Sequence, residues 1–462
     1  MKLVKSHKQI YDNIHGPIPI SNYACRIIDT IEFERLRYLR QLGTCYYVFP
    51  SATHTRFEHS VGTYYVTSWI LDSIRNNSSE IHINSCVSAI DELKHYFNRT
   101  YGNAIHYKLD DYVCELIKIA GLCHDLGHGP FSHLFDDVFI PIMSYGKEYH
   151  PYHHHENRSC AIIETIIKKD PELSKIITDP EIQFIKNLIN PQKNHIGFIY
   201  QIISNNLNGI DVDKFDYLTR DAINLGLKFG FDYTRLLNDA KVIDNIICYP
   251  EQMYNEVSAI FDIRYKLHKQ VYTHKVVISS QYMINDMMLI MEPIIHLYEC
   301  ITDMNKFYKL TDNYVIEAMK FFEHFKNNLL DEQGRKLIDT AFKTWVDLNE
   351  RRMYKFIGSI VSKVDKDISI NSICNIDESI NPDDIILHKS KIGFVSGSKA
   401  NPFDELYFYN NKNPNKCIKV QKEKVTFLIS DTYQEYIYMF FVKDSQNVQL
   451  IEKIKNIFHL FE

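Results

Sequence analysis

The chain has 462 residues, enough to bury a large hydrophobic core and to hold two or three domains. Its net charge of −6 at pH 7 argues against a general nucleic-acid-binding protein, although a local basic patch could still bind nucleic acid. No stretch approaches the roughly 18 uninterrupted apolar residues of a membrane-spanning helix, and the N-terminus lacks the apolar segment of a signal peptide. The ten cysteines include no C-x-x-C pair, which indicates reduced thiols and an intracellular protein, cytoplasmic or nuclear.

The first hundred residues contain two predicted helices. Only 16 glycines and 14 prolines interrupt the periodic stretches of the chain, so the sequence as a whole predicts a mainly helical protein. We expect residues 1–24 to be irregular, residues 25–42 to form one helix, and residues 46–50 to be a short extended piece ended by proline. A second helix begins around residues 54–62 and runs to about residue 76. The polar residues 77–108 are expected to form a loop-rich insertion.

Residues 124–133, His-Asp-Leu-Gly-His-Gly-Pro-Phe-Ser-His, are the densest group of metal-ligand side chains. They follow an apolar run with helical periodicity, so His124 and His128, four residues apart, lie on one face if that helix continues. Asp125 adds a carboxylate, and two glycines and a proline let the backbone turn so that His133 returns to the same place. A capped helix with surface histidines is the alternative, but three histidines with an interleaved carboxylate favour a metal site.

The residue after the first histidine indicates the kind of metal site. In zinc proteases with the His-x-x-x-His spacing this residue is a glutamate that acts as general base, whereas here it is Asp125, which is better placed to bind the metal itself. Mixed nitrogen and carboxylate ligands suit Fe, Mn, Mg or Zn, ions that activate water against phosphorus. A protease is the less favoured interpretation.

Histidines elsewhere divide into candidate ligands and solvated residues. His59 alone would be an ordinary core or surface histidine, but beside Arg56 and upstream of the His-Asp pair it is a candidate ligand. In residues 134–158, His155 opens an apolar helix, and we expect it to reach a site. The other histidines of this tract are expected to be solvated: His150, His153 and His154.

Two further polar stretches follow the helical residues 159–203. Four aspartates lie in residues 208–221, which is costly unless they are solvated, paired with Lys214 and Arg220, or bound to a cation. Residues 255–275 place cations and an aromatic ring at helical spacing, which suits a polyphosphate. The alternative for residues 208–221 is an exposed charged helix, and the alternative for residues 255–275 is a plain basic helix face.

The pattern changes from about residue 300. Helical periodicity continues to about residue 365, and residues 366–462 alternate strand-like segments with Asn-rich turns before a last helix. The expected strands are Ile385–Leu387, Leu406–Tyr409 and Ile418–Val420. The sequence therefore predicts a mainly α fold with a smaller C-terminal α+β lobe.

An ordered series of short motifs carries a resemblance to a known family. The motifs are Ile14–Gly16, Arg26–Thr30, Arg35–Tyr38, Gln41–Gly43, Tyr46–Pro50, Arg56–Ser60, Ala120–His133, Asn208–Tyr217 and Lys309–Asn313. With them the sequence resembles the HD-domain deoxynucleoside triphosphate (dNTP) triphosphohydrolases, most closely the catalytic core of members that also have a SAM domain, which is not expected here. The resemblance thins at residues 77–108 and 315–400. It implies an HD phosphohydrolase core with an N-terminal regulatory segment in residues 1–300, and a helical and α+β lobe in residues 301–462.

The resemblance implies a metal-dependent reaction that converts a dNTP to a deoxynucleoside and inorganic triphosphate. The implied metal ligands are His59, His124, Asp125 and Asp213. The histidines implied around the α-phosphorus are His128, His133 and His155, with His133 as proton donor to the departing nucleoside oxygen. The ion could be Fe, Mn, Zn or Mg, and a second Mg could accompany the triphosphate.

The resemblance also implies substrate contacts. The implied phosphate contacts are Arg56, Lys214, Arg264 and Lys275. At the sugar, Gln41 and Asp221 would hold the 3′-hydroxyl, and Leu42 and Tyr272 would crowd the 2′ position. Tyr217 and His268 would also line the site.

Regulation is a further implication. In the resembling enzymes a guanine nucleotide bridges subunits, which implies guanine-nucleotide and dNTP activators and a homo-oligomer, a dimer or tetramer. The implied regulatory residues are Asp29, Glu34, Arg37, Val48 and Phe49. Asp29 and Arg37 match the guanine contacts, whereas Glu34 replaces a glutamine and Tyr11 replaces a small amide. We therefore expect a weakened guanine-nucleotide effect, with constitutive activity as the alternative.

Two other functions remain open. Another HD phosphohydrolase, acting on monophosphates or cyclic nucleotides, would leave the cations of residues 255–275 unexplained. A non-enzymatic nucleotide sensor or nucleic-acid-binding relative would have no need of a complete ligand set.

Overall fold

Helices make up most of the protein, and the predicted mainly α fold is confirmed. The computed structural model describes residues 6–102, 106–228, 232–394, 401–419 and 432–462. The longer helices are α3 (Arg56–Asn77), α6 (Asp111–Cys123), α8 (His155–Lys169), α10 (Asp179–Ile189), α11 (Val212–Asn224), α13 (Tyr254–Leu267), α14 (Lys275–Ile295), α16 (Asp312–Leu329), α17 (Glu332–Asn349) and α19 (Val448–Phe461). The shorter helices are α1 (Asn22–Ile28), α2 (Ile31–Glu34), α4 (Glu80–Ser88), α5 (Asp91–Tyr101), α7 (Ile140–Ser144), α9 (Leu173–Ile176), α12 (Thr234–Asn238), α15 (Met304–Phe307) and α18 (Ile370–Ile376). Among the described residues, no helix combines the length and apolar character needed to cross a membrane.

Three helices position the candidate ligands, because α3 packs against both α6 and α11. α3 begins with a capping box, in which Thr55 and Glu58 satisfy backbone N–H groups at each other's positions. α11 begins at its N-cap Asp211, whose side chain accepts a hydrogen bond from a backbone N–H of the first turn. His59 and Asp213 lie in the first turns of α3 and α11, and His124 is the C-cap of α6. The ends of three buried helices therefore present these side chains.

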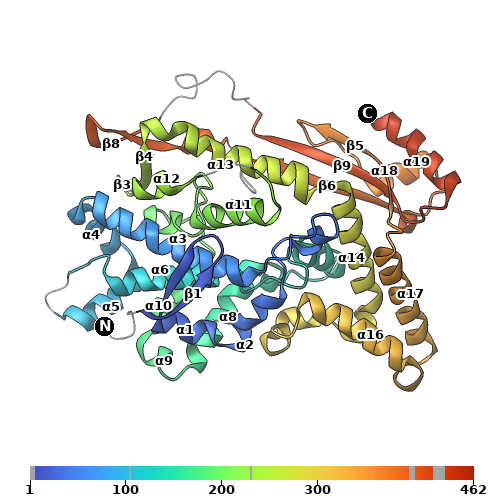
Figure 1. Cartoon of the computed structure of the whole chain (residues 1–462), viewed down its shortest axis with the longest axis horizontal. Helices are drawn as coiled ribbons and strands as arrows, with labels where there is room; N and C mark the ends of the chain where they lie inside the picture. The colour runs from blue at the N-terminus through green and yellow to red at the C-terminus, as the bar shows by residue number, and fades with distance from the viewer. Residues whose placement is uncertain (1–5, 103–105, 229–231, 395–400, 420–431) are drawn as a thin grey trace.

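Small sheets surround the helical core. The strands are β1 (Ser6–Asp12), β2 (Gly16–Ser21), β3 (Lys241–Ile243), β4 (Ile246–Pro250), β5 (Lys355–Ser362), β6 (Ile385–Gly393), β7 (Tyr407–Asn410), β8 (Asn413–Lys419) and β9 (Gln434–Val442). β1 and β2 form a hairpin, β5, β9 and β6 form an antiparallel sheet in that order, and β3, β4, β7 and β8 form a third sheet in which β4 and β7 are parallel. Figure 1 shows the β5–β9–β6 sheet with α18 and α19 at one end of the molecule, beside α14 and α17.

The C-terminal strands and the last helix are predicted correctly. β6 contains the expected strand Ile385–Leu387, and β7 and β8 cover most of the other two expected strands. Val420 lies outside the described residues. The helical prediction to about residue 365 is wrong at its end, because strand β5 begins at Lys355 and pairs with β9.

The predictions for the first 50 residues are wrong in three places. The segment expected to be irregular forms the β1–β2 hairpin, in which Ile10 pairs with Ile18. The single helix expected for residues 25–42 is broken into α1, α2 and a 3₁₀ turn, because Thr30 leaves the helical conformation and its side chain accepts a hydrogen bond from Phe33 N at 3.3 Å, which starts a new helix. The piece expected to be extended at residues 46–50 instead follows and overlaps another 3₁₀ turn, Gly43–Tyr47.

The expected loop-rich insertion at residues 77–108 is also wrong, because it contains α4 and α5. Leu93, Tyr96 and Phe97 of α5 are buried at the i, i+3, i+4 spacing of an amphipathic helix. The many polar residues of this segment lie on the outer faces of these helices, so the polar composition masked a helical pattern.

Candidate metal centre and active site

The four side chains expected to bind metal meet in one place, here called the His–Asp cluster (His59, His124, Asp125 and Asp213). His59 Nε2 lies 3.1 Å from Asp213 Oδ1, 3.3 Å from His124 Nε2 and 3.5 Å from Asp125 Oδ2. His124 Nε2 lies 3.3 Å from Asp125 Oδ1 and 3.5 Å from Asp213 Oδ1. A divalent ion about 2.1 Å from each ligand atom places neighbouring ligand atoms roughly 3.0–3.4 Å apart in tetrahedral or octahedral geometry. His59, His124 and Asp125 lie close enough together to share one such ion, and Asp213 lies next to both histidines of the cluster.

The other ring nitrogen of each cluster histidine is held by a hydrogen bond. His59 Nδ1 lies 2.8 Å from Asp216 Oδ2, and His124 Nδ1 lies 2.8 Å from the carbonyl oxygen of Gly121. Both acceptors favour a proton on Nδ1, which leaves the Nε2 lone pair free for a metal.

Asp216 belongs to a buried ion-pair network behind the cluster. Arg220 donates to both oxygens of Asp216, at 2.8 and 2.9 Å, and to Asp12 Oδ2 at 2.8 Å. His15 Nε2 lies 2.7 Å from Asp216 Oδ1, so the β1–β2 turn contacts the residue that holds His59. Burial alone would raise the pKa of Asp216, but Arg220 and the two histidines hold it well below its usual range. The carboxylate thus stays charged in the core.

Carboxylates surround the cluster and make it attractive to a cation. Burial alone would lower the pKa of His59, but its hydrogen bonds to Asp213 and Asp216 outweigh burial and raise the pKa to about 10. A proton or a metal ion therefore balances this negative charge, which agrees with the geometry of the ligand atoms.

The three candidate catalytic histidines form a second group beside Asp125. The His128 and His155 rings stack with centroids 3.9 Å apart, and the His133 ring lies 5.0 Å from that of His128. His128 Nδ1 lies 2.6 Å from Asp136 Oδ2, and Asp136 also pairs with the buried Arg158. The His133 side chain is 65% exposed, against 23% for His155 and 2% for His128, so it is the most open to solvent of the three.

Two of the residues expected to bind phosphate, Arg56 and Lys214, lie next to members of the cluster. Arg56 pairs with Asp125, and Lys214 Nζ lies 3.1 Å from Asp211 Oδ2. Burial opposes the charge on Lys214, but Asp211 raises the pKa of this lysine. The Tyr217 ring stands edge-on to the α3 histidine of the cluster, with centroids 6.5 Å apart. These residues therefore adjoin the candidate metal centre.

The cations of residues 255–275 are less closely grouped. Arg264 donates to the carbonyl oxygen of Gly393, and burial together with Arg264 lowers the pKa of His268. Lys275 Nζ lies 5.5 Å from the centroid of the Phe356 ring. No contact among the described residues places Lys275 against the His–Asp cluster, so its phosphate role remains a prediction.

Residues expected at the sugar form a buried polar group. Tyr272 donates its hydroxyl to Asp221 Oδ2 at 2.5 Å, and His54 Nε2 lies 2.8 Å from Asp221 Oδ1. The backbone N–H of Gln41 donates to the carbonyl oxygen of His54 at 3.0 Å. The buried Oε1 of Gln41 has no hydrogen-bond partner among the described residues. Leu42 packs against the hydrophobic core. An unsatisfied amide oxygen of this kind is available to a ligand hydroxyl.

The residues expected to contact a guanine base are engaged in ion pairs within the chain. Lys8 Nζ lies 2.6 Å from Asp29 Oδ1. Arg37 donates to Glu34 at 2.5 and 3.2 Å, and its guanidinium lies over the Phe57 ring, 3.5 Å from the centroid. Glu34 therefore accepts the hydrogen bonds of the Arg37 guanidinium, which the resemblance assigns to a guanine base.

The other two regulatory candidates, Val48 and Phe49, follow the Gly43–Tyr47 turn. The Phe49 ring stands edge-on to His274 with centroids 6.2 Å apart, and Arg351 donates to the carbonyl oxygen of Tyr47 at 2.8 Å. Residues just before α14 and just after α17 therefore border this turn.

Sequence reasoning did not identify several residues that support the site. Asp136 contacts the candidate histidine His128 directly. His15, Asp12 and Arg158 act on the candidate ligands and histidines only through other side chains. The Asp216–Arg220 spacing of four residues indicates a helical ion pair, but nothing local indicates that its partners come from the β1–β2 hairpin.

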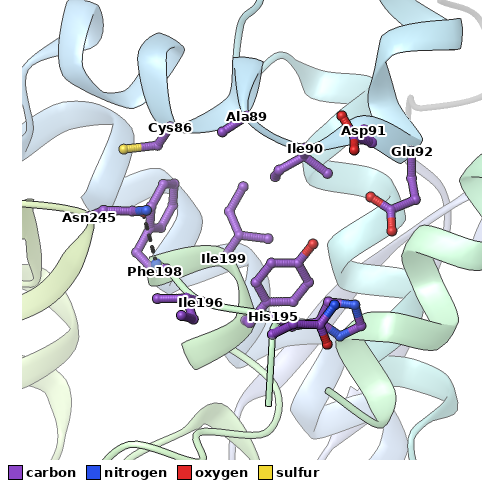
Figure 2. A pocket seen from close by; sticks show the side chains of 13 residues that line it. Cys86, Ala89, Ile90, Asp91, Glu92, His195, Ile196, Phe198, Ile199 and Asn245 are labelled. Carbon is purple, nitrogen blue, oxygen red and sulfur yellow. Dashed lines mark hydrogen bonds between the residues drawn. The ribbon is translucent and has the colours of Figure 1, made fainter. Parts of the chain in front are cut away.

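A pocket away from the cluster lies between the α4–α5 segment and residues 194–200 (Figure 2). Asn245 accepts a hydrogen bond from the backbone N–H of Phe198 at its edge. None of the predicted site residues lines this pocket.

Known proteins resemble the whole chain. The family model of the HD domain matches residues 56–221, which include all four residues of the His–Asp cluster. An HD-domain-containing protein of Acanthamoeba polyphaga mimivirus is 40% identical over 461 residues, covering 97% of this chain and 95% of that protein. The deoxynucleoside triphosphate triphosphohydrolase SAMHD1 homolog of Dictyostelium discoideum is 32% identical, covering 97% of this chain and 80% of that protein. The deoxynucleoside triphosphate triphosphohydrolase SAMHD1 of Homo sapiens is 30% identical, covering 96% of this chain and 72% of that protein.

Proposed function

This chain belongs to the HD-domain family that includes the SAMHD1 deoxynucleoside triphosphate triphosphohydrolases, and we propose that it hydrolyses dNTPs to deoxynucleoside and inorganic triphosphate. The observation that carries the proposal is the His–Asp cluster with three histidines beside it and Arg56 and Lys214 at its edges. A cluster of this composition suits metal-assisted attack on phosphorus.

In the proposed site, His59, His124, Asp125 and Asp213 would hold one divalent ion, Fe, Mn, Zn or Mg. When bound, the ion supplies Lewis acidity toward water and phosphate oxygens. Both cluster histidines present Nε2 to it, because their Nδ1 atoms are hydrogen-bonded to other acceptors.

Side chains of the protein offset the charge of the triphosphate and supply the proton that the 5′-oxygen needs. Arg56 and Lys214 offset the negative charge of the triphosphate as water attacks the α-phosphorus. The bond between that phosphorus and the 5′-oxygen then breaks, the attacking water gives up one proton to the solvent, and the triphosphate leaves as one unit. His133, exposed and hydrogen-bonded to Asp137 through Nδ1 at 3.1 Å, gives its proton to the 5′-oxygen. The products are a deoxynucleoside and triphosphate that carries the oxygen of the attacking water.

Product analysis with dGTP in ¹⁸O-labelled water tests this proposal. We expect deoxyguanosine and triphosphate as the first products, with the label in the triphosphate. The matched control is the same protein after dialysis against a chelator, which should form neither product. Initial formation of dGMP and pyrophosphate, or label in deoxyguanosine, would contradict the proposed bond cleavage.

Product analysis with other nucleotides distinguishes the alternative functions. Release of phosphate from dGMP, or opening of a cyclic nucleotide, without turnover of dGTP would indicate another HD phosphohydrolase. Tight binding of dGTP to the metal-loaded protein without any product would indicate a nucleotide sensor.

We also propose that guanine nucleotides and dNTPs act as weak activators of a homo-oligomer. The ion pair between Glu34 and Arg37 should weaken this activation, because a guanine base must displace the Glu34 carboxylate before Arg37 can donate a hydrogen bond to the base.

A further inference from the structure

Asp312, at the start of α16, contacts two turns of the active-site region although it lies far from both in sequence. Its side chain is buried, with 2% of the residue exposed. Oδ1 accepts a hydrogen bond from the backbone N–H of Phe131 at 2.6 Å, and Oδ2 accepts one from the backbone N–H of Arg40 at 3.0 Å. Only a carboxylate offers one acceptor oxygen to each of two N–H groups at this position.

The two turns carry different parts of the proposed site. The turn at residues 39–43 carries Gln41 and Leu42, which are expected at the sugar. The turn at residues 129–133 carries His133, the proposed proton donor. Asp312 therefore joins the side of the site that would recognise the sugar to the side that would donate the proton.

The second turn has an unusual backbone that its surroundings must hold in place. Phe131 and Ser132 have φ values of 59° and 58°, in the left-handed region that side chains other than glycine rarely adopt. Such conformations persist where neighbouring groups fix them, and they gather at functional sites. The hydrogen bond from Phe131 N to Asp312 is one such restraint.

The two turns also contact each other directly. Ser132 Oγ donates to the carbonyl oxygen of Arg40 at 2.8 Å, and Arg56 Nε donates to Ser132 Oγ at 2.8 Å. Gly43 has a φ of 50°, and a Cβ atom there would lie 2.9 Å from the carbonyl oxygen of Phe131. The turns are therefore packed so closely that a shift of one displaces the other.

We propose that Asp312 is a positioning residue that holds these two turns in register, so that the sugar-binding residues and His133 keep a fixed separation. The inference rests on the proposed function for its effect on catalysis. We call the two hydrogen bonds from Phe131 N and Arg40 N to Asp312 the clamp, and the clamp itself rests only on these contacts. It predicts that loss of one acceptor oxygen weakens both the rate of reaction and the preference for deoxyribose.

Asp312→Asn tests the proposal, because it keeps the volume of the side chain but turns one acceptor into an NH₂ donor that faces an N–H group. For dGTP we expect kcat/KM to fall about 10- to 100-fold, the loss that misplacement by about 1 Å produces. The ratio of kcat/KM for dGTP to that for GTP should also fall. Bound metal should stay unchanged, because Asp312 contacts none of the four ligands. Peptides containing Arg40 and Phe131 should exchange their amide hydrogens faster.

The matched control is Asp331→Asn, at the N-cap of α17. Its carboxylate accepts from the backbone N–H of Gly334 at 2.7 Å, and asparagine caps helices equally well. This control should leave rate, substrate ratio and amide exchange at wild-type values.

The outcomes separate the clamp from the proposed function. Unchanged amide exchange in both turns of Asp312→Asn would overturn the clamp, whatever the protein hydrolyses. Faster exchange with an unchanged dGTP-to-GTP ratio would overturn the positioning role and leave a structural anchor. A wild-type protein without dNTP turnover would refute the proposed function, and exchange would still decide on the clamp. If Asp312→Asn does not fold, Asp312→Glu should show the same changes at smaller size, and wild-type behaviour of that variant would overturn the inference.

Discussion

Gly62 lies in α3 where the buried ion-pair network of Asp216 and Arg220 packs against the helix. A Cβ atom at this position would lie 2.7 Å from Asp216 Cγ, and it would overlap Asp216 Oδ1 and Arg220 Nη2. Gly62→Ala therefore pushes the carboxylate that holds the His59 ring. The variant tests whether this network positions the candidate metal ligand.

The change in folding stability caused by Gly62→Ala is the sum of two opposing contributions. In a helix interior, alanine is favoured over glycine by about 1 kcal/mol. Overpacking a buried site costs about 1–3 kcal/mol, and separating a buried ion pair adds part of the roughly 3–5 kcal/mol that an uncompensated charge costs. We therefore expect Gly62→Ala to destabilise the fold by about 2–5 kcal/mol. Loss of the hydrogen bond to His59 should weaken metal binding about 10- to 100-fold.

Thermal unfolding and metal retention against a chelator measure these two effects. The matched control is Gly334→Ala in α17, where a Cβ atom would lie 3.1 Å from Asp331 Oδ1 and 3.2 Å from Leu330 Cβ. That substitution should change stability by less than about 1 kcal/mol and leave metal binding unchanged. A Gly62→Ala protein that is as stable as the wild type and retains its metal would refute the role assigned to the network.

Three further predictions concern the cluster, the sugar and regulation. Asp213→Ala should lose bound metal and nearly all dNTP turnover, and full metal by elemental analysis in an active variant would exclude Asp213 as a ligand. Ribonucleotides should be poor substrates, because a buried unpaired 2′-hydroxyl costs about 1–3 kcal/mol; Leu42→Ala should narrow the gap between GTP and dGTP turnover, and equal turnover by the wild type would contradict this. Glu34→Gln should free Arg37 and strengthen any stimulation of dTTP hydrolysis by GTP, measured with light scattering in parallel; an unchanged response would show that the ion pair does not limit activation.

The candidate site could be predicted from the sequence where its chemistry is local. Residues 124–133 combine ligand types, helical spacing and turn residues in one segment, and the structure brings His59 and Asp213 to them. Periodicity also located α3 and α19. The roles of the site residues in metal binding and catalysis remain predictions.

The parts that escaped prediction depend on contacts between distant segments. His15 lies 201 residues from Asp216, and Asp312 lies 181 residues from Phe131, so no local pattern could connect them. The break at Thr30 escaped notice because the apolar periodicity continues through it, and only the capping hydrogen bond shows where one helix stops.

The parallel pairing of β4 with β7 has a consequence for how the chain folds during synthesis. Tyr249 pairs with Phe408, so one edge of β4 has no strand beside it until the ribosome has made the residues of β7. At about 5–20 residues per second, that wait is on the order of 10 s. An open strand edge is a template for pairing with another chain. A protein truncated before residue 407 would still contain the residues of the His–Asp cluster but would expose this edge permanently, so such fragments should aggregate rather than accumulate as folded protein.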